Sequence, residues 1–369
     1  MGRTGKVRSS SRGRRRGRRR VKKDQKCKED RISQLSDDLI DHILSYVSSD
    51  LAVQTMVLSK RWLNLWTTLS CLNFKRPVSA GNYENFVTNF LENRNQQCVL
   101  SKFSFDCYSG ARKILSICLD YALCHKVEHL SICWVDLADY PCRINFACVK
   151  TLHLKLCENL RMLNFWTLPS LTSFYLKTSR IGQVLRFENL KELTLDLMYP
   201  EKPTEETITI NCPKLQSLTL KPYFRHKFIV SAPNLYYLSY CSRHVSAFST
   251  TDGFRCIKQV HIDIRKKFGD FFDLSGLPNG NVRKLAMQNF ISMLKAVRET
   301  PFLELSSETI TGLRMIPNLS EYEHPSLGNL NFICLRGAGL FDLRPPRSTD
   351  YVINYLLTNS PCAKIIRRL

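Results

Sequence analysis

The chain has 369 residues, of which 44% are apolar, and a formal net charge of +22 at pH 7. This composition can bury substantial cores, and no apolar run is long enough to cross a bilayer, so we expect no membrane partner. The 15 cysteines include no Cys-x-x-Cys pair. We therefore interpret them as reduced, mostly buried thiols of an intracellular protein.

Much of the positive charge lies in residues 1–28, which contain 14 Lys or Arg and one acidic residue. A segment with so little to bury and so much self-repulsion is predicted to be disordered. Dense basic runs act as nuclear import signals or bind nucleic acid without sequence preference. We therefore expect the nucleus, with the cytoplasm as a second compartment, and either an importin or nucleic acid as partner; a merely solubilising extension is the alternative. The import candidates are Arg14, Arg15, Arg16, Arg18, Arg19, Arg20, Lys22 and Lys23.

Three short amphipathic helices are predicted within residues 29–73. The first has Ser36 as its N-cap, the second lies around Leu51–Leu58, and the third begins at Leu58. Their apolar faces cannot all be buried among themselves, so part of this surface is expected to need a partner. The alternative is a small helical domain in which the tryptophans are simply core. The apolar stripes consist of Leu39, Ile40, Ile43, Leu44 and Val47, and of Leu58, Trp62, Leu65, Trp66 and Leu69.

The string Leu58-Ser59-Lys60-Arg61-Trp62, followed by Leu65-Trp66, resembles the F-box of plant proteins that pair an F-box with leucine-rich repeats. The resemblance implies that residues 29–73 bind an SKP-type adaptor, which links the chain to a cullin scaffold carrying the ubiquitin-transfer machinery. It assigns that contact, or its immediate support, to Leu35, Leu39, Ile43, Leu44, Val47, Val53, Leu58, Trp62 and Trp66.

A connecting segment, residues 74–98, contains one further helical pattern. Apolar side chains at Tyr83, Phe86, Val87, Phe90 and Leu91 follow helical spacing. We predict a helix over residues 82–94 that caps the open N-terminal end of the array that follows.

Residues 99–340 contain a repeated Leu-x-x-Leu-x-Leu pattern in which other apolar residues also occur. Its nine triplets begin 19 to 27 residues apart, a period typical of leucine-rich repeats. Each repeat is predicted to supply one short strand and a return segment; a miscellaneous mixed sheet is the alternative. The triplets are Leu100/Phe103/Phe105, Val127/Leu130/Ile132, Val149/Leu152/Leu154, Leu171/Phe174/Leu176, Leu190/Leu193/Leu195, Leu215/Leu218/Leu220, Leu235/Leu238/Tyr240, Ile257/Val260/Ile262 and Val282/Leu285/Met287.

Strand alternation predicts which side chains oppose the buried leucines. Concave faces of solenoids commonly bind partners, so we expect a target protein there; a merely solvated face is the alternative. These charged and hydroxyl side chains do not indicate which ligand would bind. The candidate target-binding residues are His153, Lys155, Tyr175, Lys177, Asp196, Lys221, His261 and Asp263, with Thr194, Thr219 and Ser239 on the same face.

The repeat signal weakens after Met287. The triplet Leu327/Leu330/Phe332 fits one later unit, and residues 341–369 are predicted to form a loop around Arg344–Arg347 and a closing helix over Asp350–Leu357.

The fold class predicted is therefore mixed α/β: a disordered basic tail, a three-helix F-box and an irregular leucine-rich-repeat solenoid. The function predicted is a noncatalytic substrate-recognition subunit of an SCF-type ubiquitin ligase. A nuclear, nucleic-acid-associated scaffold acting through the tail is the alternative. No catalytic motif is found, and no cofactor or metal is expected: His125 and His129, near Cys118 and Cys124, lack paired ligand spacing.

Overall fold

The computed structural model describes most of the chain between its basic tail and its last residue. The described residues are 34–75, 82–106, 112–133, 144–157, 166–179, 181, 184–198, 206–265, 279–314, 316, 318–337, 349–358, 360 and 362–368. The basic tail with its predicted import residues lies outside them, as does the loop at 344–347.

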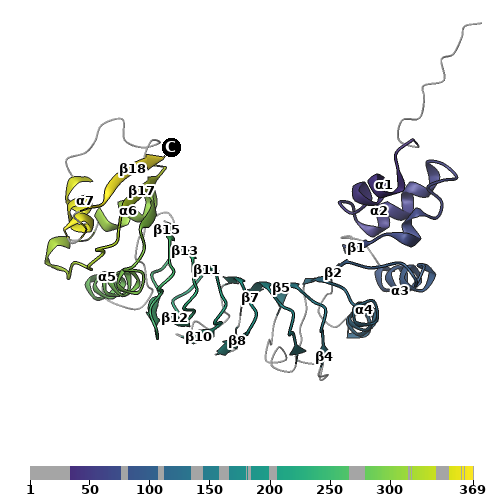
Figure 1. The fold of residues 1–369 in the computed structure, drawn as a ribbon, viewed down its shortest axis with the longest axis horizontal. Helices are drawn as coiled ribbons and strands as arrows, with labels where there is room; N and C mark the ends of the chain where they lie inside the picture. Colours follow the sequence, from purple (N-terminus) through teal and green to yellow (C-terminus); the bar gives the residue numbers. More distant parts are fainter. Residues whose placement is uncertain are drawn as a thin grey trace, which may run out of the picture.

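One parallel sheet of twelve strands lines the inner, concave side of an arc (Figure 1). The spatial order of its strands follows their order in the chain, as expected for stacked repeats. The strands are β1 (Cys71–Phe74), β2 (Lys102–Asp106), β3 (His129–Cys133), β5 (Thr151–Cys157), β7 (Ser173–Thr178), β9 (Glu192–Leu197), β11 (Ser217–Pro222), β13 (Tyr237–Ser242), β15 (Gln259–Ile264), β16 (Phe302–Ser306), β17 (Phe332–Arg336) and β18 (Lys364–Arg368).

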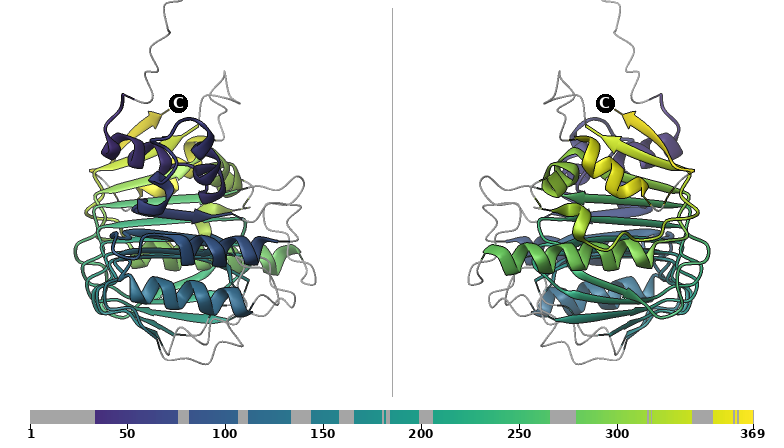
Figure 2. Two further views of the ribbon diagram at one scale, coloured as in Figure 1. Left: turned by 90° about the vertical axis from the view of Figure 1, so that its right-hand side faces the viewer. Right: turned by 90° about the vertical axis from the view of Figure 1, so that its left-hand side faces the viewer.

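Short strands and helices form the outer, convex layer (Figure 1). A view along the arc shows the inner strands of successive units running alongside one another, with long helices at the side (Figure 2). The outer strands are β4 (Ile144–Asn145), β6 (Trp166–Thr167), β8 (Val184–Arg186), β10 (Thr207–Asn211), β12 (Lys227–Ser231) and β14 (Ala247–Thr250). The helices beyond β1 are α3 (Tyr83–Asn93), α4 (Arg112–Cys124), α5 (Asn279–Ala296), α6 (Ser307–Arg314), the 3-10 turn η5 (Leu319–Glu321) and α7 (Thr349–Leu357).

The predicted triplets explain the register of the inner sheet. The first eight triplets fall on the eight successive strands from β2 to β15. Within them Leu152 pairs with Leu130 and Phe174, and the second apolar position is aligned in the same way. These side chains are buried between the two layers, so every unit completes its core with its neighbours. The parallel pairing is consistent with the predicted solenoid and differs from a miscellaneous mixed sheet.

The ninth triplet is wrong, because Val282, Leu285 and Met287 lie on helix α5 rather than on a strand. An amphipathic helix and the triplet share the i, i+3 spacing, so the pattern alone could not separate them. The next strand is β16, which buries Leu303 and Leu305. Its first triplet position is occupied by the polar residue Thr300. Because the pattern requires an apolar residue there, this repeat was not predicted.

The later triplet is displaced by three residues. Leu330, Ile333 and Leu335 occupy the three repeat positions, and β17 begins at Phe332, whose side chain remains partly exposed. Helix α7 confirms the helix predicted near the C-terminus. Strand β18, which pairs with β17, was not predicted.

The first edge of the sheet is β1, which begins inside the segment that we assigned to the F-box, residues 29–73, and ends at Phe74. Leu69, Leu72 and Phe74 follow the same triplet spacing and are buried, and β1 pairs with β2. Helix α3 is confirmed as a helix, but it connects β1 to β2, and its Phe90 ring lies 5.1 Å from that of Phe74. It therefore covers the core rather than capping the edge.

Helices α1 (Asp37–Leu44) and α2 (Ser49–Gln54) supply groups that close this edge. The backbone N–H of Ser70 donates to Asp41 Oδ1 over 3.1 Å, and that of Asn73 donates to Ser49 Oγ over 2.9 Å. An edge strand otherwise leaves such donors open to another chain. The amino-terminal helices are thus joined to the sheet through its own hydrogen-bonding groups.

The predicted third helix is not formed. Residues 34–75 contain α1, α2 and two 3-10 turns, η1 (Thr55–Val57) and η2 (Leu65–Thr68), with turns at 60–64. The hydroxyls of Thr67 and Thr68 donate to the carbonyls of Asn64 and Leu65. Such local bonds, together with branched side chains, compete with a regular α-helix.

Candidate functional site

Helix α1 has one buried and one exposed apolar face. Its N-cap is Ser36, whose Oγ accepts from the Leu39 N–H at 3.4 Å, and Asp37 and Asp38 lie in its first turn. These groups satisfy the helix N-terminus and its dipole. Ile40 and Leu44 face the core, whereas Leu39 and Ile43 are 52% and 46% exposed. The exposed pair is four residues apart, so both project from the same side of the helix.

The nine predicted adaptor residues differ in their accessibility. Leu39, Ile43 and Leu58 are exposed and available for contact, whereas Leu44 and Trp62 are buried. The half-buried members, which pack against the core, are Leu35, Val47, Val53 and Trp66. The Trp66 ring lies 4.8 Å from Phe90 of α3, so both indoles belong to the internal packing of this region.

Four exposed apolar residues were missed by the sequence analysis, namely Tyr46, Leu51, Val57 and Leu63. With Leu39, Ile43 and Leu58 they make seven of the twelve large apolar side chains that are exposed among the described residues. We call these seven residues the apolar surface of the amino-terminal helices. Because helical periodicity was used to find candidates, residues in turns, such as Val57 and Leu63, gave no signal.

The second candidate site is the concave face of the sheet, where the predicted target residues lie in two rows. Register places His153 beside Tyr175 and Lys155 beside Lys177. The rows continue across the strands through hydroxyl and charged side chains. The first contains His153, Tyr175, Thr194, Thr219, Ser239 and His261, and the second contains Lys155, Lys177, Asp196, Lys221 and Asp263.

The centre of the rows is tied together by polar contacts. Tyr175 Oη donates to Asp196 Oδ2 at 3.1 Å, and Lys177 Nζ lies 3.8 Å from the same oxygen. Burial and the neighbouring Asp196 carboxylate raise the pKa of Tyr175 to about 12, so its hydroxyl remains a proton donor at neutral pH. Lys155 and Lys221 are exposed and present positive charge to the concave side.

Toward β16 the face carries buried charge that was only partly predicted. His261 Nδ1 lies 3.4 Å from Glu304 Oε1, and Arg336 Nε lies 3.1 Å from that oxygen. Burial lowers the pKa of His261, although the Glu304 carboxylate opposes the shift. Glu304 was missed because the register of β16 was not assigned. Cys241 was missed as well, although the alternation along β13 places it in the second row beside Asp263.

Three of these side chains could ligate a metal. Cys241, His261 and Asp263 each offer a donor atom, and the three atoms lie within 4.8 Å of one another. Cys118, Cys124, His125 and His129 form no such group in the described part of the chain. His125 instead stacks on Tyr121 with ring centroids 4.0 Å apart. No helix among the described residues is both long and apolar enough to span a membrane.

No family model matches this chain. F-box/FBD/LRR-repeat protein At4g26340 of Arabidopsis thaliana is 27% identical over 258 residues, which cover 64% of this chain and 60% of the relative. F-box/FBD/LRR-repeat protein At1g13780 of the same plant is 28% identical over 327 residues, covering 77% of this chain and 68% of the relative.

A third relative extends the similarity further along the chain. F-box/LRR-repeat protein 13 of Arabidopsis thaliana is 22% identical over 344 residues, which cover 84% of this chain and 72% of the relative. The chain spans about three fifths of the length of the first relative, At4g26340. The chain is thus a homologue of Arabidopsis F-box/FBD/LRR-repeat proteins, which supports the plant F-box/LRR family that its motifs resemble.

Proposed function

We propose that this chain is a noncatalytic substrate-recognition subunit of an SCF-type ubiquitin ligase. In this proposal the amino-terminal helices bind an SKP-type adaptor that leads to a cullin scaffold. The concave face of the sheet binds a protein to be ubiquitinated. The names of the homologues, which combine an F-box with leucine-rich repeats, support the general role.

The observation that carries the proposal is the apolar surface of the amino-terminal helices. Most of the exposed large apolar side chains of the described residues are concentrated in residues 39–63. Burying such a side chain contributes about 1.5–3 kcal/mol, and large exposed apolar patches mark sites of protein–protein interaction.

The mechanism would be proximity rather than catalysis. The amino-terminal helices lie at one end of the arc, and no other described helix or strand lies across its inner side (Figure 1). One partner can therefore be held at the end while another occupies the inner side. Tethering raises the effective concentration of the target beside the ubiquitin carrier.

Adaptor binding is tested by measuring the affinity of the full chain for an SKP-type adaptor. Replacing Leu39 and Ile43 together by Asp should weaken binding by at least about 30-fold, since truncated hot spots cost about 2 kcal/mol or more. Both side chains are exposed, so the variant should stay folded. Val99→Asp, which alters an exposed residue outside the helices, is the matched control. Equal affinities of the double variant and the control would refute the adaptor site.

Target binding is tested separately by reversing charge on the concave face. Lys155→Glu, Lys177→Glu and Lys221→Glu are combined, and the control combines Lys113→Glu, Lys227→Glu and Lys284→Glu, whose side chains are exposed on the outer layer. Proteins that accumulate on the full chain when ligase activity is blocked are identified. Loss of the same proteins from the concave variant alone is expected, and their retention would exclude these lysines.

We also propose that the basic tail directs the protein to the nucleus through an importin. The support is compositional, with 14 Lys or Arg in residues 1–28. A fluorescent fusion lacking residues 1–28 should shift toward the cytoplasm. An unchanged distribution would remove this part of the proposal.

A further inference from the structure

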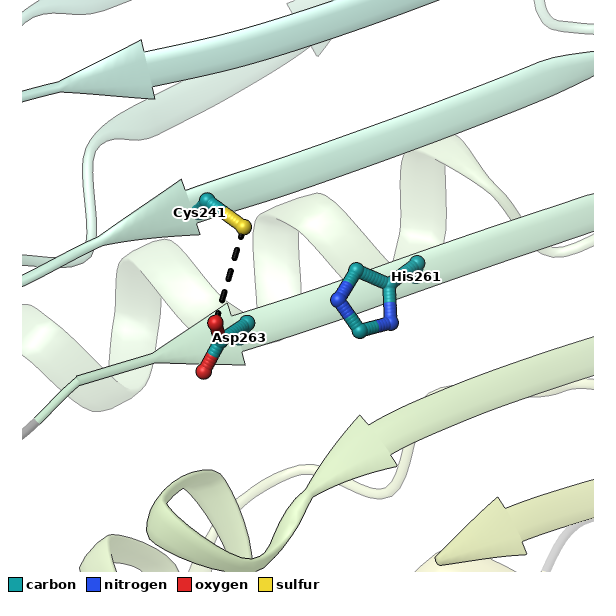
Figure 3. Close-up of side chains that lie close together, drawn as sticks. All are labelled: Cys241, His261 and Asp263. Atoms are coloured by element: carbon teal, nitrogen blue, oxygen red, sulfur yellow. Dashed lines mark hydrogen bonds between the residues drawn. The ribbon is translucent and has the colours of Figure 1, made fainter. Parts of the chain in front are cut away.

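A compact group of sulfur, nitrogen and oxygen donors lies on the concave face, near the end remote from the amino-terminal helices. Cys241 comes from β13, and His261 and Asp263 come from the adjacent β15 (Figure 3). Cys241 and Asp263 are register partners, and His261 and Asp263 are two residues apart, so all three project from the same face. Their donor atoms lie within 4.8 Å of one another.

The spacing of two of these donors already matches tetrahedral zinc. Cys241 Sγ lies 3.6 Å from Asp263 Oδ2. Bond lengths of about 2.3 Å to sulfur and about 2.0 Å to oxygen place the two ligand atoms roughly 3.5 Å apart at a tetrahedral angle. The thiol and carboxylate thus need little movement to share one ion.

His261 is oriented as a third ligand. Its Nδ1 faces Glu304 Oε1 at 3.4 Å, and Figure 3 shows the other ring nitrogen turned toward Cys241 and Asp263. A histidine that ligates zinc usually presents its second nitrogen to a carboxylate, which fixes the ring and its tautomer. Glu304 is in the position to do this.

The pair behind the site is buried without a well-formed hydrogen bond. Glu304 is 4% exposed and His261 is 9% exposed, and neither Glu304 Oε1 nor His261 Nδ1 makes a hydrogen bond of good geometry with another described residue. Glu304 Oε1 is instead paired with the Arg336 guanidinium, whose Nε lies 3.1 Å away. Burying polar atoms without a well-formed hydrogen bond is unfavourable. A small rotation of the imidazole that brings Nε2 onto a metal and Nδ1–H onto Glu304 would satisfy both atoms.

We propose that Cys241 Sγ, His261 Nε2 and an Asp263 carboxylate oxygen bind Zn²⁺, with Glu304 positioning His261. The mixed donor set favours zinc over calcium or magnesium, which prefer all-oxygen ligands. Binding releases the Cys241 thiol proton to solvent, because the ligand is the thiolate. The fourth position faces the concave side and takes a water or a donor from a bound partner. The ion would link β13 to β15, independently of the ligase role.

Arg265 is the competing cation at this site. Its Nε donates to Asp263 Oδ2 at 2.7 Å, and its side chain is 67% exposed. It can therefore turn toward solvent when the metal binds. Removing this guanidinium should leave Asp263 more available, so Arg265→Gln is expected to tighten zinc binding, an effect that misfolding cannot produce.

The test measures Zn²⁺ affinity of the metal-free, reduced full chain by competition with a chromophoric chelator, and uses Co²⁺ as a spectroscopic probe. Cys241→Ser and Asp263→Asn should each weaken affinity more than tenfold, and Glu304→Gln about tenfold. The Co²⁺-loaded protein should show the absorption of a tetrahedral site with one thiolate ligand. The absorption that comes from the thiolate should be lost in Cys241→Ser. Cys133→Ser changes a cysteine in the same row of the sheet and is the matched control.

Thermal unfolding in chelator, followed by circular dichroism, checks that each variant is folded. Added Zn²⁺ should raise the unfolding midpoint of the wild type, of Cys133→Ser and of Arg265→Gln by more than that of Cys241→Ser or Asp263→Asn. Equal zinc affinity of the wild type and Cys241→Ser would overturn the proposal. A Co²⁺ spectrum without thiolate absorption, or unchanged affinity in Arg265→Gln together with unchanged affinity in Asp263→Asn, would overturn it as well.

Discussion

The amino-terminal helices and the repeat sheet differ in how far their apolar side chains are buried. Each inner strand buries its apolar side chains against its neighbours, and the rows on the concave face of the sheet consist mainly of hydroxyl, imidazole and charged side chains. Residues 39–63, in contrast, keep seven large apolar side chains exposed among the described residues. The stack completes its core by repetition, whereas these seven side chains are not covered by any other described part of the chain. The proposed adaptor would account for this difference.

The largest expected effect separates core from surface within the amino-terminal helices. Trp62 is buried, whereas Leu58, four residues earlier, is exposed. Trp62→Ala should lower the free energy of unfolding of this region by about 3–5 kcal/mol. Leu58→Ala should change it by less than about 0.5 kcal/mol and weaken adaptor binding instead. Denaturant unfolding measures the first effect, and a binding titration measures the second. Equal destabilisation by Trp62→Ala and Leu58→Ala would contradict the assignment of Trp62 to the core and Leu58 to the surface.

A second change tests how firmly the two regions are joined. Arg94 is buried, and its guanidinium donates to the carbonyls of Leu69 at 2.8 Å and Cys98 at 3.3 Å. Arg94→Met should lower the free energy of unfolding by about 2–3 kcal/mol, because buried carbonyl acceptors lose a charged hydrogen-bond donor. Arg298→Met, which removes a largely exposed arginine, serves as control in the same denaturation experiment. If Arg94→Met lowered the free energy of unfolding no more than the control did, the link between the amino-terminal helices and the sheet would not depend on this arginine.

A smaller effect is expected at the edge of the sheet. Asp41 accepts from the Ser70 N–H at 3.1 Å and from the Ser70 hydroxyl at 2.6 Å. Asp41→Ala should destabilise the protein by about 1–2 kcal/mol and increase hydrogen exchange at the Ser70 amide. Glu92→Ala, on the exposed side of α3, should have little effect. Unchanged exchange at Ser70 would mean that α1 does not close this edge.

The last effect is a dependence of stability on pH, and it originates in the repeat sheet. Burial lowers the pKa of His226 to about 4, and neither ring nitrogen has a hydrogen-bond partner among the described residues. The folded state keeps this imidazole neutral while the unfolded state takes up a proton below about pH 6.5. Stability should therefore fall between about pH 6.5 and pH 4, by no more than about 1.4 kcal/mol per pH unit for this group. His226→Gln should flatten that slope, and an identical slope in the variant would remove His226 as its source.

Much of the sheet could be predicted because its buried positions recur in a fixed pattern. The eight triplets from Leu100 to Ile262 confirm this, and the two rows of the concave face follow from strand alternation. The prediction failed where a polar residue took an apolar position, as Thr300 does before β16, and where a helix imitated the spacing, as α5 does.

The amino-terminal site was harder to predict for a different reason. Periodicity marks Leu39 and Ile40 alike, and only the tertiary packing of α1 decides which of its two faces is covered. Trp62 and Trp66 carry the strongest motif signal and yet pack inward, whereas Val57 and Leu63 lie in turns and are exposed. In the sheet, Glu304 was missed because no local signal revealed that it would face His261 from a strand over forty residues away.

The central claim is that the apolar surface of residues 39–63 is covered by another polypeptide. Hydrogen–deuterium exchange of the full chain, with and without an SKP-type adaptor, tests it most directly. We expect protection within residues 37–63 and unchanged exchange in strands β5 to β15. Absence of binding, or protection confined to the sheet, would contradict it.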